Sequence, residues 1–592
     1  MKSREAIRKK ILEYINLIWG TRRVDRLDPI VKLMIDEVSN EIFLIYNKIE
    51  DIEAVILEKI AKIITTAEYI SVRPSHTIIQ MNPHNPVCTI TTDTALYMNE
   101  VPAEMVTKKI ETIAFYPVTD ALLWNAWLSY IFHDKRLYTM LSHNEKEQKA
   151  TTGKRIAYNS LWLGVEVAEG IENLNGFSFY IDFPHLSEIH DYYDLLPYTT
   201  CFIGEQEVKL KSGYPKPANK EYPESDKAIF HLYKGHYLSI DEDVKLKNML
   251  QVSLPDDIKE HVNGEQVADM PSMLWIRLQF LPAFLPADLD NIHIAINTFP
   301  ASNKKLAHIP IIKDNLETTT ILPGNRYEKL LDVDVVLDQE GTHYLPEVKS
   351  FSDIPGTYHL DKTNRMFQEE YNLTDIIERL RDVIQDEKVA FPEMDVDLLD
   401  NVMSAIESSE SGVFDRTGKN KRDDNKIIGK INFSPLDKTS EIAVKYWLTF
   451  GESLNGIPAG KAFSTHKNSP LHGVEAMTIT EIHGSKEFKD IKELPSINKY
   501  MLTSKNKIFT DHDILSFCEC ELNDMIKTVE VKLGNKVSLK PNEGLVRSIH
   551  INLYPHPKYP EKIRTKGVLR RLKTQLYQRS PRHYNYTINI IE

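Results

Sequence analysis

The sequence has few of the residues from which disulfide frameworks and zinc sites are built. It holds four cysteines among 592 residues. That number is too small to brace a chain of this length with disulfides, and free thiols suit a reducing compartment. Cys518 and Cys520 lie two residues apart, but no second cysteine pair lies near them. We therefore expect Cys88, Cys201, Cys518 and Cys520 to be small buried side chains rather than metal ligands or a redox pair.

Long hydrophobic runs are also missing. No stretch of 18 apolar residues occurs, so no transmembrane helix is predicted. The first twenty residues are basic and then apolar, as in a signal peptide, but Glu13 and Asn16 interrupt the apolar part and no small-residue cleavage site follows. The apolar residues have helical spacing instead, which predicts an amphipathic helix ending near Gly20. We expect a cytoplasmic protein.

The common catalytic motifs are absent as well. There is no Gly-x-Ser-x-Gly, His-Glu-x-x-His or Gly-x-Gly-x-x-Gly pattern. The segment GIPAGKA (456–462) resembles a phosphate loop, but it has three residues instead of four between its glycines and an alanine after the lysine. Histidines and carboxylates are numerous and scattered, and none stands out as an acid, a base or a ligand. We therefore predict no catalytic, cofactor-binding or metal-binding residues and no enzymatic activity.

A long apolar stripe in residues 27–60 is the clearest feature that is present. Asp28 can cap a helix that begins at Pro29. From there, isoleucines and valines recur in steps of four and three for almost four heptads. We call these residues the helix seam: Val31, Ile35, Val38, Ile42, Ile45, Ile49, Ile52 and Ile56.

The helix seam requires a partner surface. An isolated helix is marginal in water, whereas burying each of these side chains contributes roughly 1.5–3 kcal/mol. The partner is either the rest of this domain or helices of other chains. Leu33, Met34, Phe43, Leu44 and Leu57 widen the apolar surface beyond a two-helix contact, which favours a bundle. We favour a bundle that includes other chains.

The remaining pattern indicates a multidomain α+β protein with N-terminal long helices, central antiparallel β-sandwich-like domains and a C-terminal α+β domain. Short strands such as FSFYIDF and MLWIRLQF follow residue 70, and DHDILSFCECELNDMIKTVEVKLG predicts a capped helix that leads into a strand. The predicted parts are a helical segment (1–70), two β-rich domains (71–225 and 226–355), a helical segment (356–410), a linker (411–426) and an α+β domain with a basic tail (427–592).

The basic tail is the one marked charge asymmetry in a chain of net charge −13. Between Lys558 and Arg582 it carries nine basic residues and a single acid, Glu561. We define its candidate docking patch as Arg564, Lys566, Arg570, Arg571 and Lys573. Interleaved tyrosines leave single-stranded nucleic acid conceivable as a ligand, but we favour an acidic protein surface and expect no nucleic acid partner.

Several segments, taken in order, resemble the TssF family of type VI secretion baseplate wedge proteins. They are DPIVKLMIDEV followed by a long apolar helix, YISVRPSHTIIQM, ITTDTALYM, IAFYPVTDALL, GFSFYIDF before YDLLPY, and INTFPASNKKL. The last of these contains Asn297, Pro300 and Asn303 in an Asn-x-x-Pro-x-x-Asn element. The resemblance covers roughly residues 1–350. A Thr92-Asp93-Thr94 turn replaces the family's usual Arg-Gly-Thr, which marks this chain as a divergent member.

The resemblance implies a structural role. A TssF-like chain would pair with a second TssF copy and with TssG in a wedge around the VgrG spike hub, and would contact the adaptor TssK and the sheath initiator TssE. Its membrane contact would be indirect, through the adaptor, at a baseplate docked on the inner membrane. A wedge of a related phage-like contractile system is the nearest alternative. A β-sandwich hydrolase and a nucleic-acid-binding protein are more distant ones.

Overall fold

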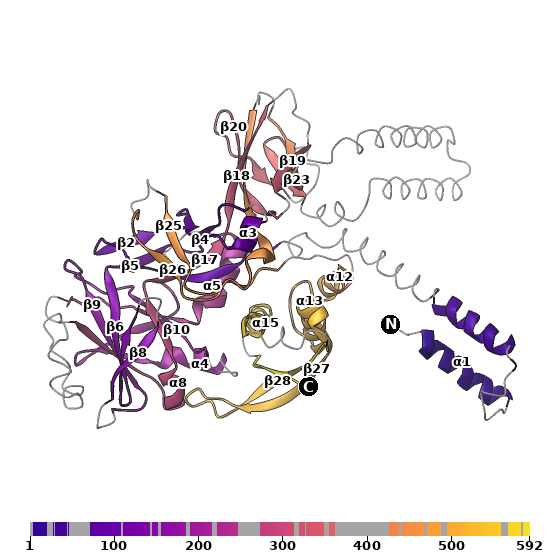
Figure 1. Ribbon diagram of the computed structural model, residues 1–592, viewed down its shortest axis with the longest axis horizontal. Coiled ribbons are helices and arrows are strands. Elements are labelled where there is room, and N and C mark those ends of the chain that lie inside the picture. The colour runs from indigo at the N-terminus through magenta and orange to yellow at the C-terminus, as the bar shows by residue number, and fades with distance from the viewer. Residues whose placement is uncertain are drawn as a thin grey trace. The chain divides into compact units, whose positions relative to one another are not determined.

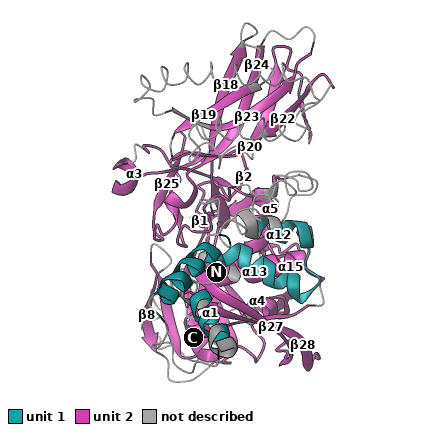
Figure 2. Cartoon of the chain, turned by 90° about the vertical axis from the view of Figure 1, so that its right-hand side faces the viewer, with its two compact units in different colours: residues 1–69, 490–524 teal, residues 70–489, 525–592 magenta. Residues whose placement is uncertain are grey.

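The computed structural model describes residues 4–19, 28, 30–43, 45, 72–107, 110–141, 145–151, 156–184, 190–215, 222–246, 273–312, 319–325, 327–347, 354–361, 425–436, 441–466, 471–486, 494–557, 566–581 and 584–591. The chain divides into two compact units (Figure 1; Figure 2). Unit 1 consists of Met1–Tyr69 and Asp490–Asp524, and unit 2 consists of Ile70–Lys489 and Met525–Glu592. The chain is of the α+β class and most of its described elements are strands in antiparallel sheets.

Unit 1 is helical in its described residues. It contains α1 (Arg4–Trp19), a helix over residues 30–43, α12 (Leu494–Ser504) and α13 (Asp511–Leu522). Thr510 and Asp513 form a capping box at the start of α13, in which each side chain accepts a hydrogen bond from the other's backbone N–H. The short 3-10 helix η10 (Asn523–Met525) contains the point where the chain passes from unit 1 to unit 2. The predicted capped helix that leads into a strand is confirmed, because a strand begins at Ile526.

Unit 2 contains a first sandwich of a seven-stranded and a four-stranded antiparallel sheet. The larger sheet has the order β12 (Gln206–Val208), β11 (Thr200–Ile203), β15 (Leu274–Gln279), β9 (Ser160–Val167), β6 (Ala126–His133), β7 (Arg136–Met140) and β8 (Lys146–Thr151). The smaller sheet has the order β13 (Leu210–Ser212), β14 (Tyr237–Ile240), β10 (Ser178–Asp182) and β16 (His293–Ile296). Apolar side chains of both sheets share one core, so the predicted sandwich architecture is present.

The central strand β9 shows why the larger sheet is buried on both faces. Alternate side chains of a strand point to opposite faces. Leu161 and Leu163 point into the shared core, whereas Trp162 joins a second cluster with Phe132 and Trp275. The strand pairing of this sandwich also crosses residue 225, where the sequence suggested a domain boundary, because β10 pairs with both β14 and β16.

A closed six-stranded barrel follows in unit 2. Its order is β1 (His76–Met81), β17 (Thr298–Asn303), β4 (Ala114–Pro117), β3 (Leu96–Met98), β25 (Ala462–Thr465) and β26 (Ala476–Thr478), and β26 pairs with β1 to close it. A two-stranded pair, β2 (Val87–Ile90) and β5 (Ala121–Trp124), contributes to the same core. Closure leaves the barrel without unpaired strand edges.

Two asparagines connect the barrel to strands that are distant in the sequence. Asn297 has a left-handed backbone (φ 56°) and lies between β16 and β17. Its Nδ2 donates hydrogen bonds to the carbonyl oxygens of Trp124 (2.7 Å) and Ala126 (2.9 Å) and to Oδ1 of Asn82 (3.0 Å). Its Oδ1 accepts the Trp124 N–H at 2.9 Å.

Asn303 makes an equivalent set of bonds at the other end of β17. Its Oδ1 accepts hydrogen bonds from the Phe450 N–H and the Thr449 hydroxyl, both at 2.9 Å, and its Nδ2 donates to the Ala114 carbonyl. Both side chains are buried. The asparagines of the Asn-x-x-Pro-x-x-Asn element therefore satisfy buried backbone groups of other strands.

A second sandwich in unit 2 packs a three-stranded sheet on a four-stranded sheet, and both contribute to one core. The sheets have the orders β18 (Lys305–Ile312), β24 (Glu441–Thr449), β20 (Lys329–Asp338) and β19 (Thr319–Asn325), β23 (Asn425–Ser434), β22 (Thr357–Asp361), β21 (Leu345–Pro346). The predicted helical segment 356–410 and linker 411–426 lie almost wholly outside the described residues.

Short helices complete the sandwiches and the barrel. They are α3 (Ala103–Thr107), α4 (His190–Leu195), α5 (Glu224–Lys234), α8 (Pro286–Asp290), η4 (Leu196–Tyr198) and η8 (Gly451–Leu454). Asp226 on α5 forms a buried ion pair with Lys304, which directly follows β17. Burial raises the pKa of Asp226, and the lysine beside it opposes that shift. The pair joins α5 to the barrel.

The C-terminal part of unit 2 is a three-stranded sheet with one helix. β27 (Ile526–Val537) and β28 (Leu545–Pro555) form an antiparallel pair, and β29 (Tyr586–Ile590) adds to β28 in parallel. The connection between the two parallel strands contains α15 (Lys566–Arg579), as a parallel crossover requires. Leu572 and Leu576 of α15 are buried, so this helix presents an apolar face inward.

Candidate interaction surfaces

The predicted N-terminal stripe begins as the sequence suggested. The Ile30 N–H donates a hydrogen bond of 2.8 Å to Oδ1 of Asp28, which confirms the expected cap. The helix then continues to residue 43, and α1 lies beside it, joined by an ion pair between Arg8 and Asp36 at 2.6 Å. Because both partners of this pair are well exposed, it contributes only about 0.2–1 kcal/mol. This ion pair is therefore a minor contribution to the stability of the two helices.

The exposed fraction of the apolar side chains falls steadily across one half of the 30–43 helix. At about 100° per residue, the apolar positions and Ser39 are arranged around half of its circumference in the order Ile30, Met34, Ile45, Val38, Val31, Ile42, Ile35 and Ser39, with the exposed Glu41 between Ile30 and Met34. In that order, the first four side chains are 67%, 63%, 52% and 50% exposed, Val31 and Ile42 are half-buried, and the last two are 6% and 0% exposed. One edge of the stripe is thus covered within the chain, and the other edge faces outward.

The helix seam is split by this gradient. Ile35 is buried, Val31 and Ile42 are half-buried, and Val38 and Ile45 are exposed. Ile49, Ile52 and Ile56 lie outside the described residues. Leu33, which is also strongly exposed, adds to the outward edge. We call Ile30, Leu33, Met34, Val38 and Ile45 the outer face, a set of large exposed apolar side chains on one side of the helix, which also carries the exposed Glu37 and Glu41.

The described residues of the candidate docking patch do not all lie on the surface. Arg564 lies outside the described residues. Lys566 and Arg570 belong to α15. Lys573 is buried and its ammonium lies 6.0 Å from the ring of Tyr577. Arg571 is half-buried, and its Nη1 donates a hydrogen bond of 3.2 Å to the Gly484 carbonyl.

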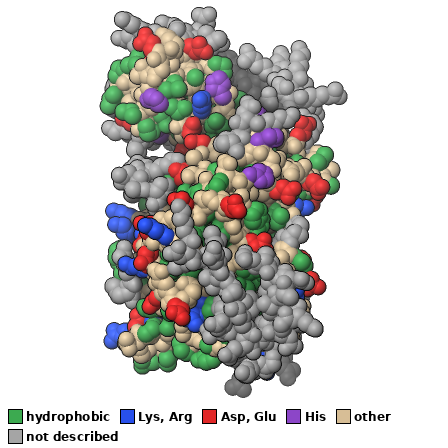
Figure 3. All heavy atoms as spheres, turned by 90° about the vertical axis from the view of Figure 1, so that its left-hand side faces the viewer, with side chains coloured by type: hydrophobic (Ala, Val, Ile, Leu, Met, Phe, Trp, Pro, Cys, Tyr) green, Lys and Arg blue, Asp and Glu red, His purple; other side chains and the backbone are tan. Residues whose placement is uncertain are grey.

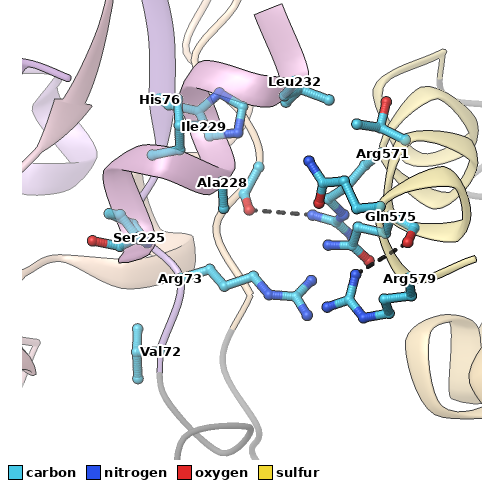
Figure 4. Close-up of a pocket in the computed structure, with 14 residues that line it drawn as sticks. Val72, Arg73, His76, Ser225, Ala228, Ile229, Leu232, Arg571, Gln575 and Arg579 are labelled. Atoms are coloured by element: carbon cyan, nitrogen blue, oxygen red, sulfur yellow. Dashed lines mark hydrogen bonds between the residues drawn. The ribbon is translucent and has the colours of Figure 1, made fainter. Parts of the chain in front are cut away.

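Arg571 lines a cavity of about 210 Å³ between α5 and α15 (Figure 4). Residues that lie just before β1 also line this cavity. Arg73 and Arg579 line it as well, together with Gln575 and Gln578. Arg73 was not predicted from the sequence, and Arg579 was predicted only as part of the basic tail and not of the candidate docking patch. The signal for Arg579 was the spacing 571, 575, 578 and 579, which places four polar side chains on one face of a helix. No pattern in the residues around Arg73 indicated that it would line a cavity.

His76 also lines this cavity and is buried. Its Nδ1 is hydrogen-bonded to the Tyr233 hydroxyl at 2.8 Å, and its ring lies edge-on to that of His483 with the centroids 4.8 Å apart. Burial, followed by the charges of His483 and Arg571, holds the pKa of His76 well below its usual value. Gly484 has φ +92°, and a Cβ there would overlap the His76 ring. His76 is therefore neutral in the folded chain at neutral pH.

The low pKa of His76 predicts acid sensitivity. The unfolded chain binds a proton at this site below about pH 6.5, whereas the folded chain does not. Stability is therefore lost as the pH falls below 6.5, by up to about 1.4 kcal/mol per pH unit until the folded pKa is reached. We expect His76→Asn to flatten the dependence of the unfolding free energy on pH between 7 and 5, measured by urea titration. The matched variant His512→Asn, at an exposed histidine, should leave the slope as in the wild type, and equal slopes for both variants would contradict the assignment.

The GIPAGKA segment has no phosphate-loop geometry. A phosphate loop directs its backbone N–H groups toward the phosphates. Here the Gly456 and Gly460 N–H groups donate to the carbonyls of Ile482 and Thr478, and the Lys461 N–H donates to the Thr478 hydroxyl. These donors are already used within the chain.

The described residues were also compared with the requirements of a metal site, a transmembrane helix and a reactive thiol. No group of three or more His, Cys, Asp or Glu side chains in them could hold a metal ion. None of the helices there is long and apolar enough to cross a membrane. Cys201, Cys518 and Cys520 are buried, and burial raises the pKa of the Cys201 thiol to about 12. Acidic and basic side chains are interspersed over the described part of the face in Figure 3.

Comparisons with known proteins covered protein families, curated proteins and solved structures. No protein-family model matches the chain. No curated protein matches it either. Solved structures are similar along nearly the whole chain, and two of them are assemblies of the type VI secretion baseplate.

The first of these two structures is a type VI secretion TssK-TssF-TssG baseplate subcomplex seen by cryo-electron microscopy. It is 12% identical, with 95% of this chain and 96% of that chain covered and a TM-score of 0.43. The second is a baseplate complex of the type VI secretion system. It is 11% identical, with 99% and 96% covered and a TM-score of 0.39.

Proposed function

We propose that this chain is a structural subunit of a type VI secretion baseplate wedge. It pairs with a TssG-like chain and a second copy of itself around a VgrG-like spike hub, and it supports assembly of the sheath. The wedge contacts TssK-like and TssE-like partners, and it reaches the membrane only through the adaptor. In this role the chain has no catalytic site, and it works in the cytoplasm at a baseplate docked on the inner membrane.

The outer face is the observation that carries this proposal. Five large apolar side chains of one helix are at least half exposed, while the adjacent edge of the same stripe is buried. Covering each of the five would contribute about 1.5–3 kcal/mol. A surface of this kind on an isolated chain favours association. An amphipathic helix from a partner, packed along the outer face, is the simplest cover with the right shape.

The segments that resemble the TssF family indicate which partners to expect. TssG and TssK are partners that this resemblance implies, and one of the similar structures is a subcomplex of TssK, TssF and TssG. A wedge of a phage-like contractile system would use the same outer face with a different partner. The hydrolase alternative needs paired carboxylates in a cleft, but the described residues that line the cavity between α5 and α15 include no acid.

Co-expression tests the proposal directly. The full chain should form a stable complex of fixed stoichiometry with the TssG-like protein encoded in the same genome, seen by sedimentation velocity. Expressed without that partner, it should self-associate. A TssK-like protein should join the complex only when the chain is present. A chain that sediments as a single monomer at all concentrations, and binds neither protein, would refute the proposal.

A further inference from the structure

The cavity between α5 and α15 is independent of the outer face, because it belongs to unit 2 whereas the helix seam belongs to unit 1. Three arginines line it, Arg73, Arg571 and Arg579, and no acidic residue is among its described lining residues. The chain as a whole carries a net charge of −13. The described lining of this cavity is therefore positively charged, although the protein as a whole is acidic.

Hydrogen bonds fix two of the three arginines, and the third points toward one of them. Arg571 donates from Nη1 to the Gly484 carbonyl (3.2 Å), and Arg579 donates from Nη1 to the Gln575 carbonyl (3.3 Å). Arg73 comes from the opposite wall, and Figure 4 shows it pointing toward Arg579. Like charges that converge in a partly enclosed space raise the local positive potential, and an anion placed between them would be stabilised. Guanidinium groups also match the planar geometry of carboxylate and phosphate oxygens.

The side of the cavity formed by α5 is mostly apolar, with Ser225 as a polar exception. Ala228, Ile229 and Leu232 of α5 and Val72 line it. A fully hydrated inorganic ion would gain nothing from this wall, whereas a short hydrocarbon group attached to an anion would be removed from water there. The volume of about 210 Å³ is below the roughly 300–1,000 Å³ of sites for drug-sized ligands, so the occupant must be small.

We propose that this cavity binds a small carboxylate or phosphate that carries a short aliphatic group. The anionic end lies among Arg73, Arg571 and Arg579, and the aliphatic end lies against Ile229 and Leu232. The proposal goes beyond the wedge assignment and does not depend on it.

Isothermal titration of the purified full-length chain tests the site with defined probes. Hexanoate and hexyl phosphate should each bind saturably with a Kd below about 1 mM, and comparing them shows which anionic group the site prefers. Inorganic phosphate should bind at least tenfold more weakly than hexyl phosphate, because it cannot use the apolar wall. Hexanol and hexylammonium should not bind. Equal binding of hexanol, or no saturable binding of either anion, would overturn the proposal.

Two variants locate the binding. Arg73→Gln and Arg579→Gln should each weaken binding of the preferred anion at least tenfold. Arg547→Gln, at an exposed arginine on β28, should leave it unchanged. Circular dichroism and the unfolding midpoint verify that each variant is folded. Unchanged affinity in both folded cavity variants would overturn the site, and the TssG-like co-expression result is unaffected by either outcome.

Discussion

Asn297→Asp is expected to destabilise the folded chain by about 3–6 kcal/mol, because at least two buried acceptors lose their donor and a carboxylate replaces a neutral amide beside carbonyl oxygens. The acceptors are the main-chain oxygens of Trp124 and Ala126 and the side-chain oxygen of Asn82. An aspartate can donate only when protonated, and then only one hydrogen bond. A loss of this size is a large part of the total stability of a typical domain. The unfolding midpoint in urea, followed by circular dichroism, measures the effect.

Asn542→Asp is the matched control for this prediction. Asn542 also has a left-handed backbone (φ 66°), but its side chain is exposed. The same chemical change at the same type of backbone conformation should shift stability by no more than about 0.5 kcal/mol. If Asn297→Asp were as mild as its control, the hydrogen bonds of Asn297 would not be the link between β17 and the β5–β6 region that we describe.

Val38→Asp and Ile45→Asp are expected to abolish assembly while the isolated chain stays folded. Both side chains are about half exposed, so a carboxylate there costs the free chain little, about 0.5 kcal/mol or less. In the wedge the same carboxylate would be buried against a partner without a counter-charge. We expect at least a hundredfold weaker binding to the TssG-like partner, measured by surface plasmon resonance or by sedimentation.

Two further substitutions in unit 1 separate assembly from folding. Ile35→Asp places a carboxylate at a buried position of the same helix and should lower the helicity and stability of the isolated chain. His512→Asp adds a carboxylate at an exposed position in the first turn of α13, where an acidic side chain is tolerated, and should leave both folding and binding intact. Retained binding by Val38→Asp and Ile45→Asp would show that the outer face is not the partner surface.

Local features of the fold followed from the sequence because they depend on neighbouring residues. The cap at Asp28 and the capped helix that precedes β27 depend on side chains within one helical turn of the helix start. The sandwiches were predicted as a class because alternating apolar residues in short segments require two covered sheet faces. The helix seam was predicted from its period, but the period could not show that only one edge of it would be covered within the chain.

The sequence by itself determined the α+β class, the helix starts, the strand-rich middle and the apolar stripe, since these arise from propensity and periodicity over ten or twenty residues. Only the tertiary structure decided the closed barrel, in which β1 pairs with β26 almost 400 residues later, and the meeting of Arg73 with Arg571 and Arg579 in one cavity. Contacts across such separations depend on how whole sheets pack, and a short stretch of sequence carries no periodic signal for them. The exposed outer face was decided in the same way, because exposure is a property of the packed chain and not of the stripe.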